Sequence, residues 1–136
     1  KTGKFKILFA MNNIDFTFII KDQFKGREDV DLTFSITGEK ALEDLRNAKE
    51  MKEPFNLVVT DLRLVNKING IDVAEAVKKE NLAPRTFLLT VFPERLTTDL
   101  KNKGVGEIIP RTEFIKLPKS VYREFLRQGY LEIPQE

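Results

Sequence analysis

Five short apolar segments recur along the chain, separated by longer segments in which apolar and charged residues mix. The short segments are rich in β-branched and aromatic residues, and the first and third are apolar at most positions, which is typical of strands covered on both faces of a sheet. The segment at 55–60 is the most strand-like and is expected at the centre of the sheet. The expected strands are 5–10 (FKILFA), 31–36 (DLTFSI), 55–60 (FNLVVT), 85–90 (RTFLLT) and 107–110 (EIIP).

The segments between and after these strands predict helices, because apolar residues recur in them near helical spacing and Gly or Pro marks most of their ends. One helix is expected from Pro93 to Gly104, since Pro93 and Glu94 both suit a first helical turn. In the other four, the apolar positions are Ile14, Phe18, Ile19 and Phe24; Ala41, Leu42, Leu45 and Ala48; Ile71, Ala74 and Val77; and Val121, Tyr122, Phe125 and Leu126.

The alternation of strands and helices predicts a parallel sheet with helices on both faces. Right-handed crossovers leave few topologies, and for five strand–helix units they favour the strand order 2-1-3-4-5, the flavodoxin-like order. We therefore expect an α/β protein built as a single-domain three-layer sandwich, spanning residues 1–136 with its core at about 5–129.

Composition excludes several classes of function. With 23 Lys and Arg against 21 Asp and Glu, the net charge of +2 does not suggest a strongly basic nucleic-acid-binding protein, and 41% apolar residues suffice for one core. The absence of Cys and His excludes disulfides, thiolate nucleophiles, Ser-His-Asp triads and almost all zinc chemistry. No apolar run approaches the roughly 20 residues that span a bilayer, so we expect a cytoplasmic protein without membrane contact.

Polar side chains stand at the carboxyl ends of the expected strands, where ligands bind in sheets of this order. Asp61 follows the third strand, Thr90 ends the fourth and Arg111 follows the fifth, with Asn12 and Asn13 after the first. Each residue taken alone is more typical of a turn or a strand end. Their coincidence at one edge favours a functional site built from a carboxylate, a hydroxyl and a guanidinium.

Four features of the sequence resemble the receiver domain of two-component response regulators. They are VVTDLRL at 58–64, Asn-Gly at 69–70 before a helix, LLT at 88–90 and a basic residue after the last strand. The resemblance extends from residue 5 to about residue 129. It implies the fold expected above and a role in phosphorelay signal transduction.

The family's site residues carry over to this chain only in part. In receiver domains the Asp that ends the third strand accepts a phosphoryl group, an acidic pair after the first strand helps hold Mg²⁺, and a Ser or Thr and a Lys contact the phosphoryl group. The resemblance makes Asp61 the candidate phosphoacceptor and Thr90 the candidate hydroxyl. Met11 and Asn12 occupy the positions of the acidic pair, and Arg111 replaces the Lys as a candidate contact to the phosphoryl group.

These departures predict weak binding of Mg²⁺. The three carboxylates of an ordinary receiver repel one another unless a cation offsets them, whereas Asp61 and Arg111 already balance in charge. Weak candidate ligands are Asp61, Asn12 and Asp15, although Asp15 better fits the first turn of a helix, where the dipole stabilises an acid. We expect no cofactor, with Mg²⁺ only if the chain is a functional response regulator.

An ion pair between Asp61 and Arg111 is expected to replace the metal and the Lys. The planar guanidinium can pair with the carboxylate through two nitrogens, and Thr90 can donate its hydroxyl to the same group. Two charges about 4 Å apart attract by roughly 4 kcal/mol at an effective dielectric near 20, but desolvation cancels much of this and leaves the sign of the net contribution open. Replacing either residue is expected to lower stability by leaving its partner unpaired.

The leading interpretation is a degenerate receiver, or pseudo-receiver, which signals through protein contacts and is not an enzyme. The first alternative is a functional single-domain response regulator phosphorylated on Asp61, and the second is a small hydrolase with Asp61 as its nucleophile. The sequence lacks a GxxxxGK[ST] loop, which disfavours an NTPase. Arg63 stands where a hydrolase of the haloacid-dehalogenase type would have a second Asp.

The resemblance also implies a surface for partners, made of the expected helix at 93–104, the strand at 107–110 and the final helix. The expected partner is a histidine kinase or an output protein, and a homodimer through this surface is a further expectation. Ile108 occupies the position of an aromatic residue that reorients on activation in the family. Binding of DNA or RNA is disfavoured, because the cations of the final segment are typical of a solvated face: Lys116, Lys119, Arg123 and Arg127.

Overall fold

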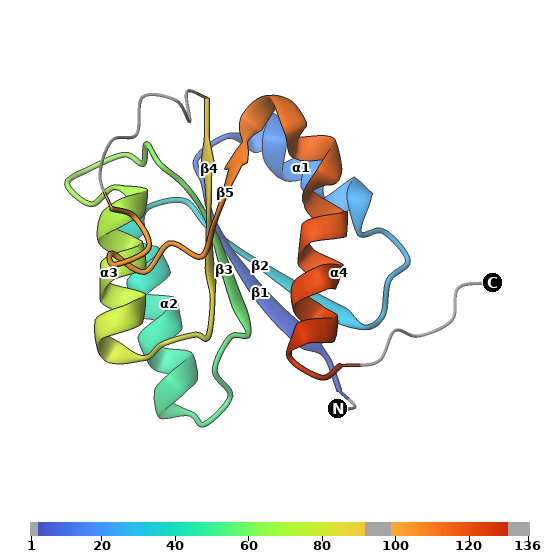
Figure 1. Ribbon diagram of the computed structural model, residues 1–136, viewed down its shortest axis with the longest axis horizontal. Coiled ribbons are helices and arrows are strands. Elements are labelled where there is room, and N and C mark those ends of the chain that lie inside the picture. Colours follow the sequence, from blue (N-terminus) through green and yellow to red (C-terminus); the bar gives the residue numbers. More distant parts are fainter. Residues whose placement is uncertain (1–2, 92–98, 131–136) are drawn as a thin grey trace.

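The computed structural model describes residues 3–91 and 99–130 and confirms both the expected fold class and the strand order. All four neighbouring pairs of strands are parallel. Where strand bounds differ from those expected, they differ by one or two residues. The sheet has the order β2-β1-β3-β4-β5 (Figure 1), formed by β1 (Phe5–Ala10), β2 (Val30–Ser35), β3 (Leu57–Asp61), β4 (Thr86–Thr90) and β5 (Glu107–Pro110).

Helices cover both faces of the sheet (Figure 1). A 3₁₀ segment that the sequence pattern did not predict, η2 (Arg111–Lys116), connects β5 to the last helix. The helix expected from Pro93 to Gly104 lies partly outside the described residues, and residues 100–104 form turns. Within the described ranges, no helix combines the length and apolar character needed to cross a membrane. One face carries α1 (Ile14–Gln23) and α4 (Leu117–Arg127), and the other carries α2 (Gly38–Glu50) and α3 (Gly70–Glu80).

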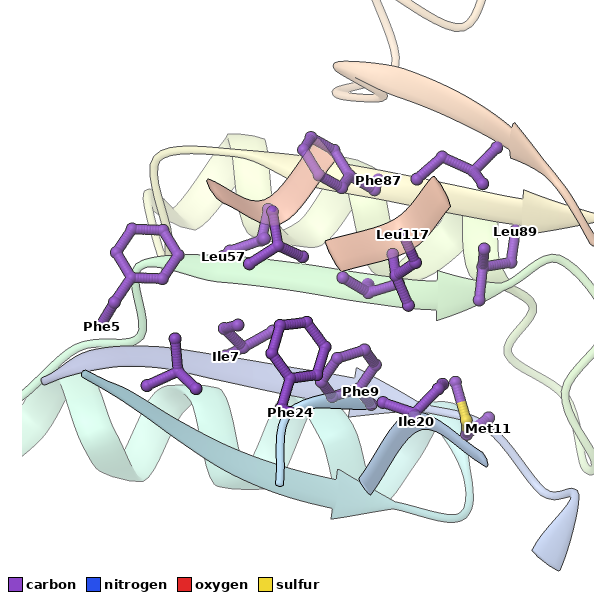
Figure 2. Close-up of a cluster of buried hydrophobic side chains, with 14 of the residues drawn as sticks. Phe5, Ile7, Phe9, Met11, Ile20, Phe24, Leu57, Phe87, Leu89 and Leu117 are labelled. Atoms are coloured by element: carbon purple, nitrogen blue, oxygen red, sulfur yellow. The ribbon is translucent and has the colours of Figure 1, made fainter. Parts of the chain in front are cut away.

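The core consists of two main layers of apolar side chains, one on each face of the sheet. Every residue of β3 and β4 is buried, as expected for central strands of a parallel sheet. Figure 2 shows the layer beneath α1 and α4, in which Phe5, Phe9 and Phe87 of the strands meet Ile20 and other helical side chains. The opposite layer joins the sheet to α2 and α3 through Ala41, Leu42, Leu45, Val73 and Val77.

The apolar spacing predicted for α1 is partly wrong. The side chains that enter the core are Phe16, Ile20 and Phe24, whereas Ile14 is 75% exposed and Phe18 is 65% exposed. Because apolar residues occur on nearly every side of this helix, their spacing does not identify the buried face. The expected apolar positions of α2, α3 and α4 are buried or partly buried against the core, apart from Leu126 at the end of α4, which is exposed.

Candidate functional site

The structure brings Asp61, Thr90 and Arg111 together at the carboxyl edge of the sheet. Asp61 ends β3 and Thr90 ends β4, and Pro110 of β5 is the register partner of Thr90, so Arg111 follows directly beside them. Asp61 is 6% exposed and Thr90 is 5% exposed. The carboxylate is therefore a buried group, and the position expected for it from the sequence is confirmed.

Arg111 pairs with Asp61 at long range. Its Nε lies 3.8 Å from Oδ1 of Asp61, which is too long for a hydrogen bond. Among the described residues Oδ1 has no hydrogen-bond partner, so the Thr90 hydroxyl does not donate to that oxygen. The expected ion pair is confirmed, whereas the expected forked, hydrogen-bonded geometry is wrong.

An aromatic contact explains the position of the guanidinium. The Arg111 guanidinium carbon lies 4.7 Å from the centre of the Phe16 ring, within the range of a cation–π contact. The Phe16 ring in turn meets Phe114 of η2 edge to face, with ring centres 5.3 Å apart. Arg111 is thus supported by α1 and by its own 3₁₀ segment rather than by the carboxylate alone.

Sequence reasoning missed the role of Phe16. The side chain of Asn13 accepts a hydrogen bond of 3.0 Å from the backbone N–H of Phe16, which fixes the start of α1. An Asn three residues before Phe16 is a helix-start signal that places this ring in the first turn, beside the end of β1. Asn13 is therefore a capping residue, and one of the two amides expected at the site is already engaged.

Burial dominates the electrostatics of Asp61. Desolvation raises the pKa of its carboxyl group to about 6, and the guanidinium of Arg111 lowers the pKa by a smaller amount. The attraction to Arg111 therefore does not offset the cost of burying the charge. Relative to the protonated carboxyl group, the ionised carboxylate is therefore disfavoured in the folded state.

The positions of the acidic pair lie in different surroundings. Met11 is 1% exposed and belongs to the core layer shown in Figure 2, whereas Asn12 is exposed. Asp15 lies exposed in the first turn of α1, as expected for an acid at a helix start. Over residues 3–91 and 99–130, no three Asp or Glu side chains come together in a group that could hold a metal ion. These donors do not fit the carboxylate-rich Mg²⁺ site of a receiver domain.

The loop after β3 folds back onto the end of the strand. The N–H of Leu62 donates to the carbonyl of Leu89 at 2.9 Å, and the N–H of Gly70 donates to the carbonyl of Leu62 at 2.8 Å. A Cβ atom on Gly70 would clash with the backbone carbonyl oxygen of Asp61. Asn69 caps α3 through a reciprocal pair of hydrogen bonds with Asp72. Gly70 thus allows α3 to begin against the candidate phosphoacceptor, and Asn69 stabilises that helix start.

Comparison with solved structures shows which fold this site belongs to. The response regulator domain of Thermotoga maritima CheB is 18% identical, covers 97% of this chain and 100% of that one, and has a TM-score of 0.69. The Francisella response regulator 1452 receiver domain is 19% identical over 91% of this chain and 98% of that one, with a TM-score of 0.72. A response regulator receiver domain protein (CheY-like) from Methanospirillum hungatei JF-1 is 17% identical over 93% and 100%, with a TM-score of 0.70.

The chain therefore has the fold of response regulator receiver domains over most of its length. At the sequence level no protein-family model and no curated protein matches. Identities below 20% in these structures establish the fold and leave the chemistry of the site to be argued from its own residues.

Replacing Gly70 tests the close approach of α3 to the end of β3. We expect Gly70→Ala to lower the free energy of unfolding by about 2 kcal/mol or more, because either the helix or the Asp61 carbonyl must shift. Denaturant unfolding at pH 7 measures the change. The capping variant Asn69→Ala is expected to cost about 1 kcal/mol. A Gly70→Ala variant within about 0.5 kcal/mol of the wild type would show that the contact is not restrictive.

Replacing Asp61 tests the cost of its charge. Contrary to the loss expected from the sequence, Asp61→Asn should gain stability relative to the wild type as the pH rises from about 4 to 8. The gain should reach about 2 to 3 kcal/mol, because only the wild type must release a proton from a carboxyl group with a raised pKa. Arg111→Ala should raise the pKa of Asp61 further.

Denaturant unfolding at several pH values measures both effects. Asp31→Asn, at an exposed position on β2, controls for the loss of one negative charge from the surface. The interpretation fails if the stability difference between Asp61→Asn and the wild type is independent of pH.

Proposed function

We propose that this chain is a receiver-like signalling module of the two-component type that acts through protein contacts, with weak or no Mg²⁺-dependent phosphorylation. One observation carries the proposal: in the described part of the chain, the buried carboxylate at the end of β3 faces one guanidinium, 3.8 Å away, at an edge where an ordinary receiver gathers three carboxylates. The module is not an enzyme under this proposal, and it works in the cytoplasm.

The charges at the site support this proposal. Mg²⁺ takes hard oxygen ligands in near-octahedral geometry, and Asp61 is the carboxylate that β3 supplies. The neighbouring positions offer a buried thioether at Met11 and an exposed amide at Asn12. Because phosphoryl transfer depends on neutralising charge in the transition state, a site without a bound divalent cation should accept phosphate slowly.

The surface formed by β5 and α4 supports binding of a protein partner. Ile108 of β5 is 37% exposed and Leu126 of α4 is 54% exposed. Arg123 lies 3.8 Å from Glu107, so charged side chains of α4 and β5 meet between these two elements. Exposed apolar and charged side chains on these two elements suit a protein surface. The partner is a histidine kinase or an output protein, and a second copy of the chain is the alternative.

A second candidate is a functional response regulator phosphorylated on Asp61. The observation that favours it is the absence, among the described residues, of a hydrogen-bond partner for Asp61 Oδ1. An oxygen without a hydrogen bond keeps its lone pairs for attack on a phosphodonor. The two candidates differ in whether the chain gains a phosphoryl group on Asp61 in the presence of Mg²⁺.

Titration with Mg²⁺ and a small phosphodonor separates these candidates. We expect millimolar Mg²⁺ to leave the amide resonances of Asn12 and Asp61 unchanged. Incubation with acetyl phosphate and Mg²⁺ should add no phosphoryl group to the intact chain, as measured by mass spectrometry, with Asp61→Asn as the control. Saturable shifts below about one millimolar, together with a phosphoryl group lost in Asp61→Asn, would establish the second candidate instead.

Restoring the acidic pair tests whether its loss explains the weak metal binding. The double change Met11→Asp and Asn12→Asp should create affinity for Mg²⁺ and lower stability without metal, because a buried apolar side chain is replaced and three carboxylates then crowd one edge. Met11→Asn with Asn12 retained separates the loss of apolar packing from the added charge. A double variant as stable as the wild type without Mg²⁺ would contradict this placement of the side chains. The same holds if Mg²⁺ stabilises the Met11→Asn control as much as it stabilises the double variant.

A further inference from the structure

A pocket of about 300 Å³ lies at the opposite end of the sheet from Asp61. It is bounded by the end of α3, the start of β4 and the turns before β5. The apolar part of the pocket wall is formed by Val77, Ala83 and Val105. This volume lies in the range of small-molecule sites, in which an apolar lining carries a few polar groups.

The charged side chains that line the pocket are all cations. Arg85 already has a partner, because its Nε lies 3.3 Å from Oε1 of Glu124. Lys78 donates a hydrogen bond of 2.9 Å to the carbonyl of Asn102, and none of the carboxylates in the described ranges forms an ion pair with it. For Lys101, no carboxylate of residues 3–91 or 99–130 lies within ion-pair distance. Two ammonium charges at one pocket therefore have no carboxylate partner in the described part of the chain, and no described lining residue carries a carboxylate.

Thr86 provides a second, independent observation. It is 1% exposed, and its hydroxyl has no hydrogen-bond partner within the described part of the chain. Leu88, two residues further along β4, packs with Ala74 of α3, so Thr86 points to the same face of the sheet as the pocket. A buried hydroxyl without a partner is costly in a folded protein. At a pocket wall, it indicates a polar partner that the described residues do not supply.

We propose that this pocket binds a small organic phosphate. The ammonium groups of Lys78 and Lys101 hold the phosphoryl oxygens at the rim, and the Thr86 hydroxyl forms a hydrogen bond at the floor. The apolar part of the ligand lies against Val77 and Val105. This site uses none of the residues around Asp61, so it stands whether or not that carboxylate is phosphorylated.

The test uses phenyl phosphate, inorganic phosphate and phenol as probes of the whole chain. Phenyl phosphate should cause saturable shifts of the amide resonances of Gly104 and Gly106, which line the pocket. Inorganic phosphate lacks the apolar part and should bind at least about tenfold more weakly. Phenol lacks the charge and should cause no saturable shift at these two residues.

Three variants assign the binding to this pocket. Lys101→Gln removes one ammonium group from an exposed position and should weaken binding of phenyl phosphate about fivefold. Thr86→Val keeps the shape of the side chain without its hydroxyl and should weaken binding about threefold, while leaving the melting temperature unchanged or raised. Lys25→Gln, an exposed cation that does not line the pocket, is the control and should not change the affinity.

Several results would overturn the proposal. The first is the absence of saturable shifts at Gly104 and Gly106 up to about 10 mM phenyl phosphate, a concentration at which even weak small-molecule binding is visible. The second is an equal loss of affinity in Lys25→Gln and Lys101→Gln, which would show non-specific attraction to surface charge. Equal affinities for inorganic and phenyl phosphate would overturn the assignment to an organic ligand, and an unchanged affinity in Thr86→Val would overturn the role of the hydroxyl.

Discussion

The central strands have no side chain that faces water, and the arrangement of the molecule follows from this constraint. All positions of β3 and β4 are buried, so helices must cover both faces, and each connection must cross from the end of one strand to the start of the next. Parallel strands reached in this way end at one edge. Side chains far apart in sequence, such as Asp61 and Arg111, are therefore brought together by the need to cover the sheet.

Among the described residues, the site at this edge pairs one negative group with one positive group. Its charge is therefore compensated differently from that of a metal centre. In a metal centre the clustered carboxylates repel one another unless a cation is bound, so binding of the cation controls the structure of the cluster. Here Arg111 is part of the chain and is held over Phe16, and its charge is present under all conditions. The remaining variable is the proton on Asp61, whose pKa burial raises to about 6.

The strands and their order were predictable because continuous apolar segments and right-handed crossovers each have few solutions. The buried face of α1 was not predictable, since this helix is apolar on nearly all sides. Only the packing of Phe16 and Ile20 in the folded protein determines which side is buried. At the site, strand ends identified Asp61 and Arg111. Their separation could not be read from the sequence, because it depends on the 3₁₀ turn of η2 and on the ring beneath the guanidinium, which are tertiary features.

The hydrogen bond between Gly70 and Leu62 also has a consequence for protein engineering. It joins the two ends of the loop at 63–69. Between these ends Val65 forms a bridge with Thr37, and the N–H of Lys67 donates to the carboxylate of Glu39. Lengthening a loop whose ends are already held together adds little closure entropy, since that cost grows only with the logarithm of length. Asn66, the exposed residue between these two contacts, is therefore a suitable place to insert a reporter peptide or a second domain, because it is close to the candidate site and lies outside the strands and helices.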